Sequence, residues 1–501
     1  MDKSRASTRL GQIVLGLLVV VGSGRFARAQ DPQSQTLDQW LAQLKDPDAI
    51  KRRQAVVALG SFGPDLTKVM IQQVGELLKD NDQAVRHATA LSIGNFGPAS
   101  KAALPAIRAA VKDDSPLVRR AAVFALGNLG TAAKSAVPEL VGALSDANET
   151  VRHAACYALG SVGEEAKAGA EALGKVLLGD TDPDVRQSAA FALGEIGSDA
   201  ANAVPALTQA LGDADDAVRK SVIEALGSMG PEAKPAVGAL AKILTSDPDF
   251  VLRRSAAYVL GEMGPEARGA AESLGKALKD ADTSVRYDAA QSLSVLGPDA
   301  KPALPALIEA LSEEDVEVLK KVIYTLGEMG PSADPASRSL VKTMDNEDED
   351  VRKAVAYALA AMGPGAGPAV PALIKGLHDS VTSVRLASAY AIGELGPNHP
   401  RALAALIAGL KDPDDDVREE IVFAIGEIGS DEKPVLDALQ QATQDPSPAV
   451  SNAAKEAIDK LEEDDEEEAV APGGNPAAVP KNIAPRKKAG GHQPRRKAQI
   501  P

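Results

Sequence analysis

The residues whose types could carry chemistry are few and scattered. The histidines are His87, His153, His378, His399 and His492, and Cys156 is the only cysteine. No nucleophile elbow, phosphate-binding loop or Cys/His zinc spacing is present. Cys156 cannot form an internal disulfide, and its Ala/Val-type helical position predicts a buried, inert thiol. We therefore expect no catalytic, cofactor-binding or metal-binding residues.

Clustered carboxylates are the second chemical possibility, because oxygen ligands suit Ca²⁺. Acidic segments such as 345–350 and 412–416 lie between apolar stretches. The EF-hand order with its central glycine is absent. Aspartates at helix starts are also explained by capping and by the helix dipole. We expect helix caps here and no calcium site.

The elements that carry these residues belong to an internal repeat. A Leu-Gly dipeptide, or a variant of it, recurs every 33 or 34 residues. Its first residue is Leu59, Ile93, Leu126, Leu159, Leu193, Leu226, Leu260, Leu293, Leu326, Leu359, Ile392, Ile425 or Ile458. Such a period predicts a stack of supersecondary units, each too thin to bury its own apolar face.

The fifth unit illustrates the local structure expected in each repeat. Asp182 followed by Pro183 predicts a capped helix start, after which apolar residues recur at helical spacing. Gly194 and Gly197 are expected to stop this helix. A second helix follows, in which Pro205 is tolerable only within the first turn. The sequence thus predicts an all-α fold, an α-solenoid of about thirteen helical hairpins.

The repeated pattern D-x-x-x-x-V-R-x-x-A-A-x-A-L-G-x-h-G resembles the phycobilisome-lyase-like branch of HEAT repeats. The resemblance covers residues 37–461 and implies a right-handed superhelix. It also implies that the arginine and aspartate form a structural ladder of charge-assisted bonds between neighbouring repeats. The arginines are Arg52, Arg86, Arg119, Arg152, Arg186, Arg219, Arg253, Arg286, Arg352, Arg385 and Arg418.

Two repeats depart from this pattern. The ninth has Leu319 at the arginine position and Glu313 at the aspartate position, and the thirteenth has Ser451. A terminal repeat has no neighbour to bond, which explains Ser451. The ninth repeat is internal, so its weakened rung is either a hinge or a tolerated substitution, and we favour the tolerated substitution.

Two enzymatic groups of HEAT proteins provide the rival function. Deoxyhypusine hydroxylases bind iron through His-Glu dipeptides, and no histidine here precedes a glutamate. His87 and His153 hold equivalent positions two repeats apart, on the order of 20 Å, which is too far to share a metal. Bilin lyases act on phycobiliproteins, which an exported chain would not meet. A lyase, an oxidoreductase and a purely structural spacer in the cell envelope remain alternatives.

One register of the first helix gathers most of the aromatic side chains. Position 6, counted from the Val of Val-Arg as zero, points well away from the core positions 0, 4, 7 and 8. Eight of the 14 aromatic residues occupy it: Phe124, Tyr157, Phe191, Tyr258, Tyr324, Tyr357, Tyr390 and Phe423. Charged residues at positions 2 and 10 flank it: Arg254, Lys320, Glu195, Glu262, Glu328, Glu394 and Glu427.

This aromatic register has two interpretations, which can hold together. The rings could wedge between neighbouring first helices and only pack the repeats. Alternatively, they form an amphipathic stripe that holds a polypeptide. The family resemblance favours binding, because it places the Val-Arg helix on the concave side and makes positions 2, 6 and 10 the surface that is varied to create binders. We expect a non-enzymatic scaffold that acts as a monomer.

The ends of the chain differ from the array. Residues 1–29 read as a signal peptide, with basic residues, an apolar run at 13–21 and a small-x-small site at 27–29. Export to the periplasm or the cell exterior is therefore expected. Residues 30–461 form the array, and a helix at 37–44 containing Trp40 covers its first repeat. Residues 462–501 are expected to be a disordered tail, acidic and then basic.

The charge of the chain is unevenly distributed. The net charge is −16; residues 1–29 contribute +4 and residues 469–501 contribute +7, so residues 30–468 carry −27. Such an array repels nucleic acid and favours a basic protein partner. The basic tail could contact an anionic cell-surface polymer, fold back onto the acidic run at 462–468, or simply remain solvated.

Overall fold

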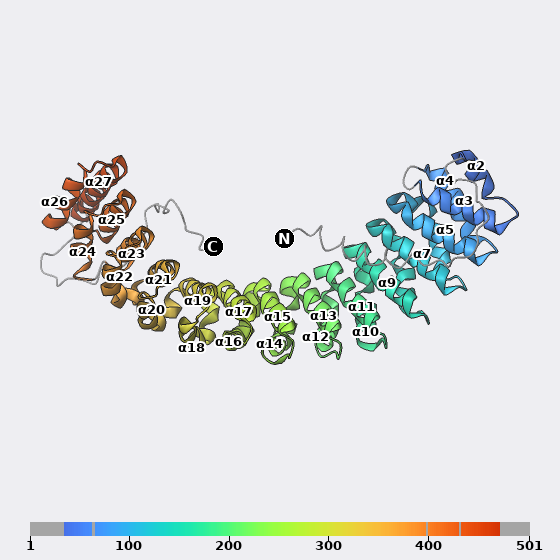
Figure 1. The fold of residues 1–501 in the computed structure, drawn as a ribbon, viewed down its shortest axis with the longest axis horizontal. Coiled ribbons are helices and arrows are strands. Elements are labelled where there is room, and N and C mark those ends of the chain that lie inside the picture. Colours follow the sequence, from blue (N-terminus) through green and yellow to red (C-terminus); the bar gives the residue numbers. More distant parts are fainter. Residues whose placement is uncertain (1–34, 63–65, 397–398, 430–431, 471–501) are drawn as a thin grey trace. The chain divides into compact units, whose positions relative to one another are not determined.

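The computed structural model describes residues 35–62, 66–396, 399–429 and 432–470, and the regular structure within these ranges is entirely helical. The chain divides into two compact units, Met1–Ala133 and Lys134–Pro501, and each is described by itself. Both units are built from the same helical hairpin. The expected all-α solenoid of stacked hairpins is therefore confirmed (Figure 1).

The first helices of the hairpins carry the odd numbers in Figure 1, from α3 onward, and contain the two positions that hold Val-Arg in most repeats. In the first unit they are α3 (Ala49–Gly60), α5 (Gln83–Asn95) and α7 (Pro116–Asn128). In the second unit they are α9 (Glu149–Val162), α11 (Pro183–Ile196), α13 (Asp216–Met229), α15 (Phe250–Glu262), α17 (Thr283–Leu296), α19 (Val316–Glu328), α21 (Glu349–Met362), α23 (Thr382–Leu395), α25 (Asp415–Ile428) and α27 (Pro448–Val470).

The second helices carry the even numbers and are shorter. In the first unit they are α4 (Lys68–Glu76) and α6 (Leu104–Ala110). In the second unit they are α8 (Val137–Ala143), α10 (Ala170–Gly179), α12 (Val204–Ala210), α14 (Val237–Ser246), α16 (Ala271–Ala277), α18 (Leu304–Glu309), α20 (Ser337–Thr343), α22 (Val370–Gly376), α24 (Ala402–Gly409) and α26 (Lys433–Ala442).

In most hairpins a 3₁₀ segment joins the two helices, a feature that apolar periodicity did not predict. These segments are η4 (Gly97–Ala103), η5 (Gly130–Ala136), η6 (Gly163–Gly169), η7 (Gly197–Ala203), η8 (Gly230–Ala236), η9 (Gly264–Ala270), η10 (Gly297–Ala303), η12 (Gly330–Ala336) and η13 (Pro364–Ala369). Two shorter ones, η3 (Leu77–Lys79) and η11 (Ala310–Ser312), follow second helices.

Helix α11 shows why the hairpin forms at these residues. The Asp182 carboxylate accepts hydrogen bonds from the backbone N–H groups of Asp184 and Val185, and Pro183 occupies the first turn. Gly197 ends the helix with a φ of 68°, a conformation that favours glycine. Pro205 lies in the first turn of α12, where its missing N–H costs no helical hydrogen bond.

The expectation that Gly194 also stops this helix is wrong, because Gly194 lies inside α11. A Cβ built there would lie 3.1 Å from the Cα of Ala225 in the next first helix. Gly160, Gly327 and Gly393 meet an alanine of the following first helix in the same way. The repeated Ala-Leu-Gly thus encodes the close approach of neighbouring first helices rather than a helix end.

The core of each unit lies between its two layers of helices. Successive first helices pack on one another, for example α3 on α5 and α9 on α11. The anchor residues of the first twelve repeats are fully buried, whereas Ile458 in the last repeat is half-buried. Burial of each leucine or isoleucine contributes roughly 1.5–3 kcal/mol, and the sum over stacked repeats stabilises the array.

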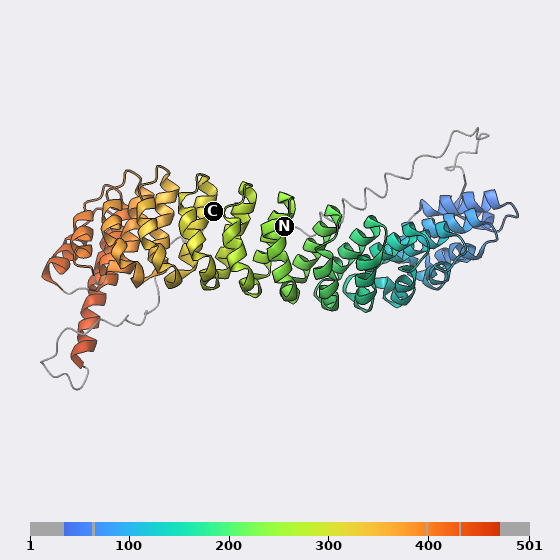
Figure 2. The same cartoon turned by 90° about the horizontal axis from the view of Figure 1, so that it is seen from below.

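Both ends of the described residues close the stack. Helix α2 (Leu37–Gln43) begins with a capping box at Thr36 and buries Trp40, as expected for a helix covering the first repeat. At the other end α27 continues to Val470, nine residues beyond the boundary expected at residue 461 (Figure 2). The expected signal peptide (residues 1–29) and the tail from residue 471 onward lie outside the described residues. Within the described ranges, no helix combines the length and apolar character needed to span a membrane.

Candidate binding face on the first helices

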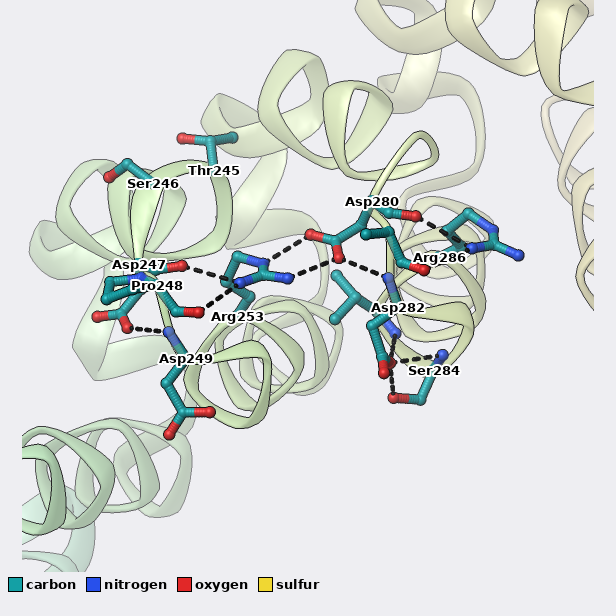
Figure 3. A network of polar contacts seen from close by, with 12 residues as sticks. Thr245, Ser246, Asp247, Pro248, Asp249, Arg253, Asp280, Asp282, Ser284 and Arg286 are labelled. Atoms are coloured by element: carbon teal, nitrogen blue, oxygen red, sulfur yellow. Dashed lines mark hydrogen bonds and ion pairs between the residues drawn. The ribbon is translucent and has the colours of Figure 1, made fainter.

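An arginine–aspartate ladder fixes the spacing of the first helices. Arg253 donates through Nε and Nη2 to the two carboxylate oxygens of Asp280, over 2.6 and 2.8 Å (Figure 3). Its Nη1 donates to the backbone carbonyls of Asp247 and Pro248 in its own repeat, over 2.9 and 3.2 Å. The same Asp280 carboxylate accepts the backbone N–H of Asp282 over 2.9 Å. One carboxylate therefore joins two repeats and shapes the loop before the next first helix.

The ladder recurs along both units, as the family resemblance implied. The pairs include Arg52–Asp80, Arg86–Asp113, Arg152–Asp180, Arg186–Asp213, Arg219–Asp247, Arg253–Asp280, Arg286–Glu313, Arg352–Asp379, Arg385–Asp412 and Arg418–Asp445. The hydrogen bond from Arg253 holds the pKa of Asp280 below its ordinary value despite burial. These groups are saturated by one another, so their role is structural.

Between the ninth and tenth repeats, both positions of the arginine–aspartate pair hold other residues. Leu319 replaces the arginine and is buried, and the position opposite holds Asn346 rather than an aspartate. The Asn346 side chain still accepts the backbone N–H of Asp348 over 2.9 Å, so the start of α21 is preserved. Glu313 is a full substitute for aspartate, because Arg286 binds both of its carboxylate oxygens.

Ion pairs join some neighbouring 3₁₀ segments, and the junction between the ninth and tenth repeats is one of several at which the residues for such a pair are absent. Lys134 pairs with Glu165, Lys167 with Asp199, and Lys234 with Glu266. The corresponding positions at the ninth junction hold Asp334 and Gly365. These pairs are solvent-exposed and individually weak, and the ninth junction keeps an exposed pair of another kind, between Lys375 of α22 and Asp345 after α20, over 2.6 Å.

The aromatic register lies on the surface of the first-helix layer, as the helical geometry predicted. Tyr258 is exposed, with a relative accessibility of 56%. The other seven are half-buried: Phe124 in the first unit, and Tyr157, Phe191, Tyr324, Tyr357, Tyr390 and Phe423 in the second. Half-buried rings pack against neighbouring helices and also present an edge to solvent. Packing and binding are therefore not exclusive.

The charged flanks of the register are mostly engaged with neighbouring side chains. Arg254 donates to Asp288 of the next first helix over 2.8 Å, and Lys320 pairs with Glu317 of its own helix over 2.7 Å. Glu427 pairs with Lys460 over 2.9 Å. The Tyr258 hydroxyl bonds Glu262 and the Tyr324 hydroxyl bonds Glu328, and burial is the first cause of the raised pKa of each tyrosine.

Lys321 and Tyr287, which the repeat pattern and the aromatic register did not indicate, complete one part of the face. The Lys321 ammonium lies 5.5 Å from the centroid of the Tyr287 ring and 5.4 Å from that of Tyr324. This is cation–π geometry, in which an ammonium is attracted by the ring face. One feature of the sequence does indicate Lys321: it occupies position 3 of its first helix, which is alanine or serine in most repeats.

A second tyrosine cluster lies on α21, α23 and α25. The Tyr357 and Tyr390 rings have centroids 5.8 Å apart and are tilted by 49°. Burial, and then the neighbouring carboxylates Glu394 and Glu420, raise the pKa of Tyr390 to about 12. Glu394 was expected at this face, whereas Glu420 was missed, although it too holds position 3.

The cysteine and two of the histidines take structural positions. Cys156 is fully buried, as expected, and burial raises its pKa to about 12. Burial also lowers the pKa of His87 and of His153. Across the described ranges, no three His, Cys, Asp or Glu side chains are grouped so that they could hold a metal ion.

Comparison with known proteins identifies the repeat. The HEAT-repeat family pattern matches residues 37–116, 104–169, 170–261, 237–322, 271–360, 337–421 and 403–472. None of the curated proteins matches the chain.

Known structures resemble the fold at low sequence identity. A homology model of the full-length AP-3 complex is 12% identical, with a TM-score of 0.52 over 86% of this chain and 92% of that one. An engineered protein is 22% identical (TM-score 0.42, 79% and 99% covered), and importin beta is 15% identical (TM-score 0.41, 85% and 61% covered). The AP-3 likeness supports a stacked-hairpin fold and nothing further.

Proposed function

The chain belongs to the HEAT-repeat family, and we propose that it is an exported, non-enzymatic scaffold that binds a polypeptide partner along the face of its first helices. We further assign it to the phycobilisome-lyase-like branch, on the repeated Asp and Val-Arg positions. In that branch this face is the concave side of the superhelix. The observation that carries the proposal is the recurrence of half-buried or exposed aromatic rings at one register of successive first helices.

The chemistry of this face suits a basic partner. Aromatic rings supply contact area at a small cost in side-chain entropy and dominate the energetics of protein interfaces. Residues 30–468 carry −27, which steers a positively charged polypeptide toward the array. The aromatic register supplies short-range affinity and the surrounding carboxylates supply the long-range attraction.

A triple substitution tests the proposed binding face. Replacing Tyr258, Tyr324 and Tyr357 by Ser removes three rings of the register, so capture of the partner from the native envelope fraction is expected to fall at least tenfold. Helical content by circular dichroism should be unchanged, and the melting temperature should fall by only a few degrees. The matched control is Leu178→Ser, which removes a 42% exposed apolar side chain from the opposite layer. If the triple variant captures the partner as well as the native chain does, this face is not the binding site. If its melting temperature falls steeply, the three rings serve packing alone.

Metal analysis of the purified chain distinguishes the scaffold from the enzymatic alternative. A scaffold is expected to purify without stoichiometric metal, whereas a hydroxylase-like oxidoreductase would carry iron. Stoichiometric iron or zinc in the purified chain would overturn the scaffold proposal.

The proposed export is tested on the chain made in its native cells. Cleavage after Ala29 predicts a mature chain that begins at Gln30. Intact-mass analysis of the envelope fraction is expected to show this species. A chain that retains residues 1–29 would contradict export through a cleaved signal.

A further inference from the structure

Position 3 of the first helices is a poor place for a charge. It is Ala or Ser in nine of the thirteen repeats and Gln54 in the first; the remaining three hold Asp288, Lys321 and Glu420. All three side chains are half-buried. Asp288 is balanced by Arg254, whose Nε lies 2.8 Å from its carboxylate. Lys321 rests over the rings of Tyr287 and Tyr324. Two of the three buried charges are therefore satisfied within the array.

Glu420 differs from these two charges because its surroundings oppose ionisation. Burial is the first cause that raises its pKa, to about 7, and the carboxylates Glu419 and Glu394 are the other two. No cation of the described residues acts to lower it. A half-buried carboxylate among carboxylates costs stability, and a positively charged ligand would remove that cost.

The neighbours of Glu420 are the two rings of the second tyrosine cluster. The helix of Tyr390, α23, packs between α21, which carries Tyr357, and α25, which carries Glu420, and the charge of Glu420 raises the pKa of both tyrosines. The rings themselves are 5.8 Å apart. Lys321 of α19 shows how an ammonium lies against two tyrosine rings, those of Tyr287 and Tyr324, in the same layer of first helices. At Tyr357 and Tyr390 the corresponding position 3 residues are Ala354 and Ala387, which supply no cation.

We propose that Tyr357, Tyr390, Glu394 and Glu420 form a binding site for a lysine or arginine side chain, and that residues 481–497 of the same chain occupy it. The rings contact the ammonium or guanidinium through their faces, and the carboxylates neutralise it. The basic segment then covers part of the proposed binding face and competes with a partner for it. This occupancy does not depend on the identity of any partner.

The charge and position of the basic segment favour it as the occupant. It contains Lys481, Arg486, Lys487, Lys488, Arg495, Arg496 and Lys497 and no acidic residue. It begins eleven residues after Val470, where α27 ends. Fully extended chain from Val470 reaches roughly 35 Å at Lys481 and about 90 Å at Lys497. Because the segment is tethered to the unit that holds the site, its effective concentration there exceeds that of a free peptide by a wide margin.

Intramolecular disulfide trapping in the full chain tests this placement. One cysteine replaces Ala361, which is exposed on α21 one turn beyond Tyr357, and another replaces Ala489 in the basic segment. The control pair is Lys375→Cys with Ala489→Cys, because Lys375 is exposed on α22, in the other layer of the same repeat. Under mild oxidation the 361–489 disulfide is expected to form at least tenfold faster than the 375–489 disulfide. Equal rates for the two pairs would overturn the proposal.

Charge-neutral substitutions then test the chemistry of the site. Glu420→Gln and Tyr390→Leu are each expected to slow the 361–489 disulfide at least fivefold, with melting temperature recorded for both. Glu224→Gln makes the same charge change on α13 and should leave the rate unchanged. No effect of Glu420→Gln would overturn the proposal.

Separate chains that carry one cysteine each complete the experiment. If chains bearing the 361 and 489 cysteines separately crosslink as fast as the double variant, the occupant is another molecule and the intramolecular proposal falls. A slow reaction between separate chains supports it. Partner capture is not involved, so this experiment and the triple-tyrosine experiment can fail independently.

Discussion

At the scale of single residues, the array contains two kinds of partly buried carboxylate. Some are bound by an arginine, whereas the surroundings of Glu420 disfavour its ionised form. Asp180 and Asp280 of the ladder have lowered pKa values because arginines bind them. Glu420 has a raised pKa because burial and neighbouring carboxylates disfavour its charge. The two kinds of carboxylate therefore change the free energy of unfolding in opposite directions as the pH rises. Asp180 and Asp280 lose their contribution to stability as the pH falls through their lowered pKa values, whereas ionisation of Glu420 reduces stability as the pH rises.

In a chain that ends at Val470, so that the basic segment cannot reach the site, Glu420→Gln is expected to make stability less dependent on pH between about 4.5 and 7. In this window the folded chain keeps a proton on Glu420 that the unfolded chain has lost, so the free energy of unfolding falls as pH rises. At pH 8 the shortened variant should be more stable than the shortened chain with Glu420 by roughly 1 kcal/mol, a value reduced for partial solvent exposure. Urea unfolding at pH 5 and pH 8 measures the difference. A shortened variant less stable than its parent at pH 8 would show that the ionised carboxylate has a stabilising partner within the array itself.

At the scale of elements, the glycines at the ends of the Leu-Gly anchors set how closely first helices approach. Gly194 lies against Ala225 of the next first helix, so any Cβ there must displace backbone. Gly142 also lies in a helix, α8, but a Cβ there meets nothing within 4 Å. The two glycines therefore separate the helix-propensity effect of glycine from its packing effect.

Gly194→Ala is expected to destabilise the second unit by about 1 kcal/mol, because crowding against Ala225 outweighs the gain of about 1 kcal/mol in helix propensity. Gly142→Ala should stabilise it by about 0.5–1 kcal/mol, since only the propensity gain operates. Thermal melts of the two single variants measure both effects. If the two substitutions have the same sign, close helix approach is not the role of Gly194.

Sequence patterns predicted the elements well where one residue determines the outcome. Asp182 and Pro183 gave the start of α11, and the recurring Arg and Asp positions gave the ladder through the family resemblance. The 3₁₀ segments were missed, since apolar periodicity does not distinguish them from a loop. Gly194 was misassigned because glycine serves both to end helices and to let them approach. Glu420 and Lys321 were missed because their roles depend on side chains from neighbouring repeats.

At the scale of the whole molecule, repeats are coupled mainly through their junctions, and the junctions are not equal. Between the ninth and tenth repeats, both positions of the ladder pair, Leu319 and Asn346, are uncharged. The buried Leu319 keeps apolar packing in place there. In a stack stabilised by contacts between neighbouring repeats, the repeats before this junction are expected to unfold with the least dependence on the repeats after it.

Restoring the rung is expected to strengthen this junction. Leu319→Arg alone places an unpaired guanidinium in a buried site and should destabilise by about 2 kcal/mol or more. Adding Asn346→Asp supplies the carboxylate, so the double variant should recover at least about 1 kcal/mol relative to the sum of the single variants. Urea unfolding of the three variants gives this coupling energy. Additive single effects would show that the two positions do not meet.

Hydrogen exchange tests the same junction in the native chain. Amides of α19 and α21 are expected to exchange faster than their equivalents in α11 and α13, whose junction keeps the Arg186–Asp213 pair. Indistinguishable protection would favour a tolerated substitution over a hinge.

The ladder also gives the stack a direction, much as a polymer has a head and a tail. Each arginine reaches forward to a carboxylate that belongs to the following repeat, and that carboxylate folds the loop in which it lies. The last repeat carries Ser451 at the arginine position, and its hydroxyl donates back to the carbonyl of Thr443 over 2.9 Å. A second molecule that brought its Asp46 to this end would find no guanidinium to receive it. Among the described residues the ladder therefore ends at the Arg418–Asp445 pair, and the side chain at the last arginine position bonds backwards instead of reaching forward.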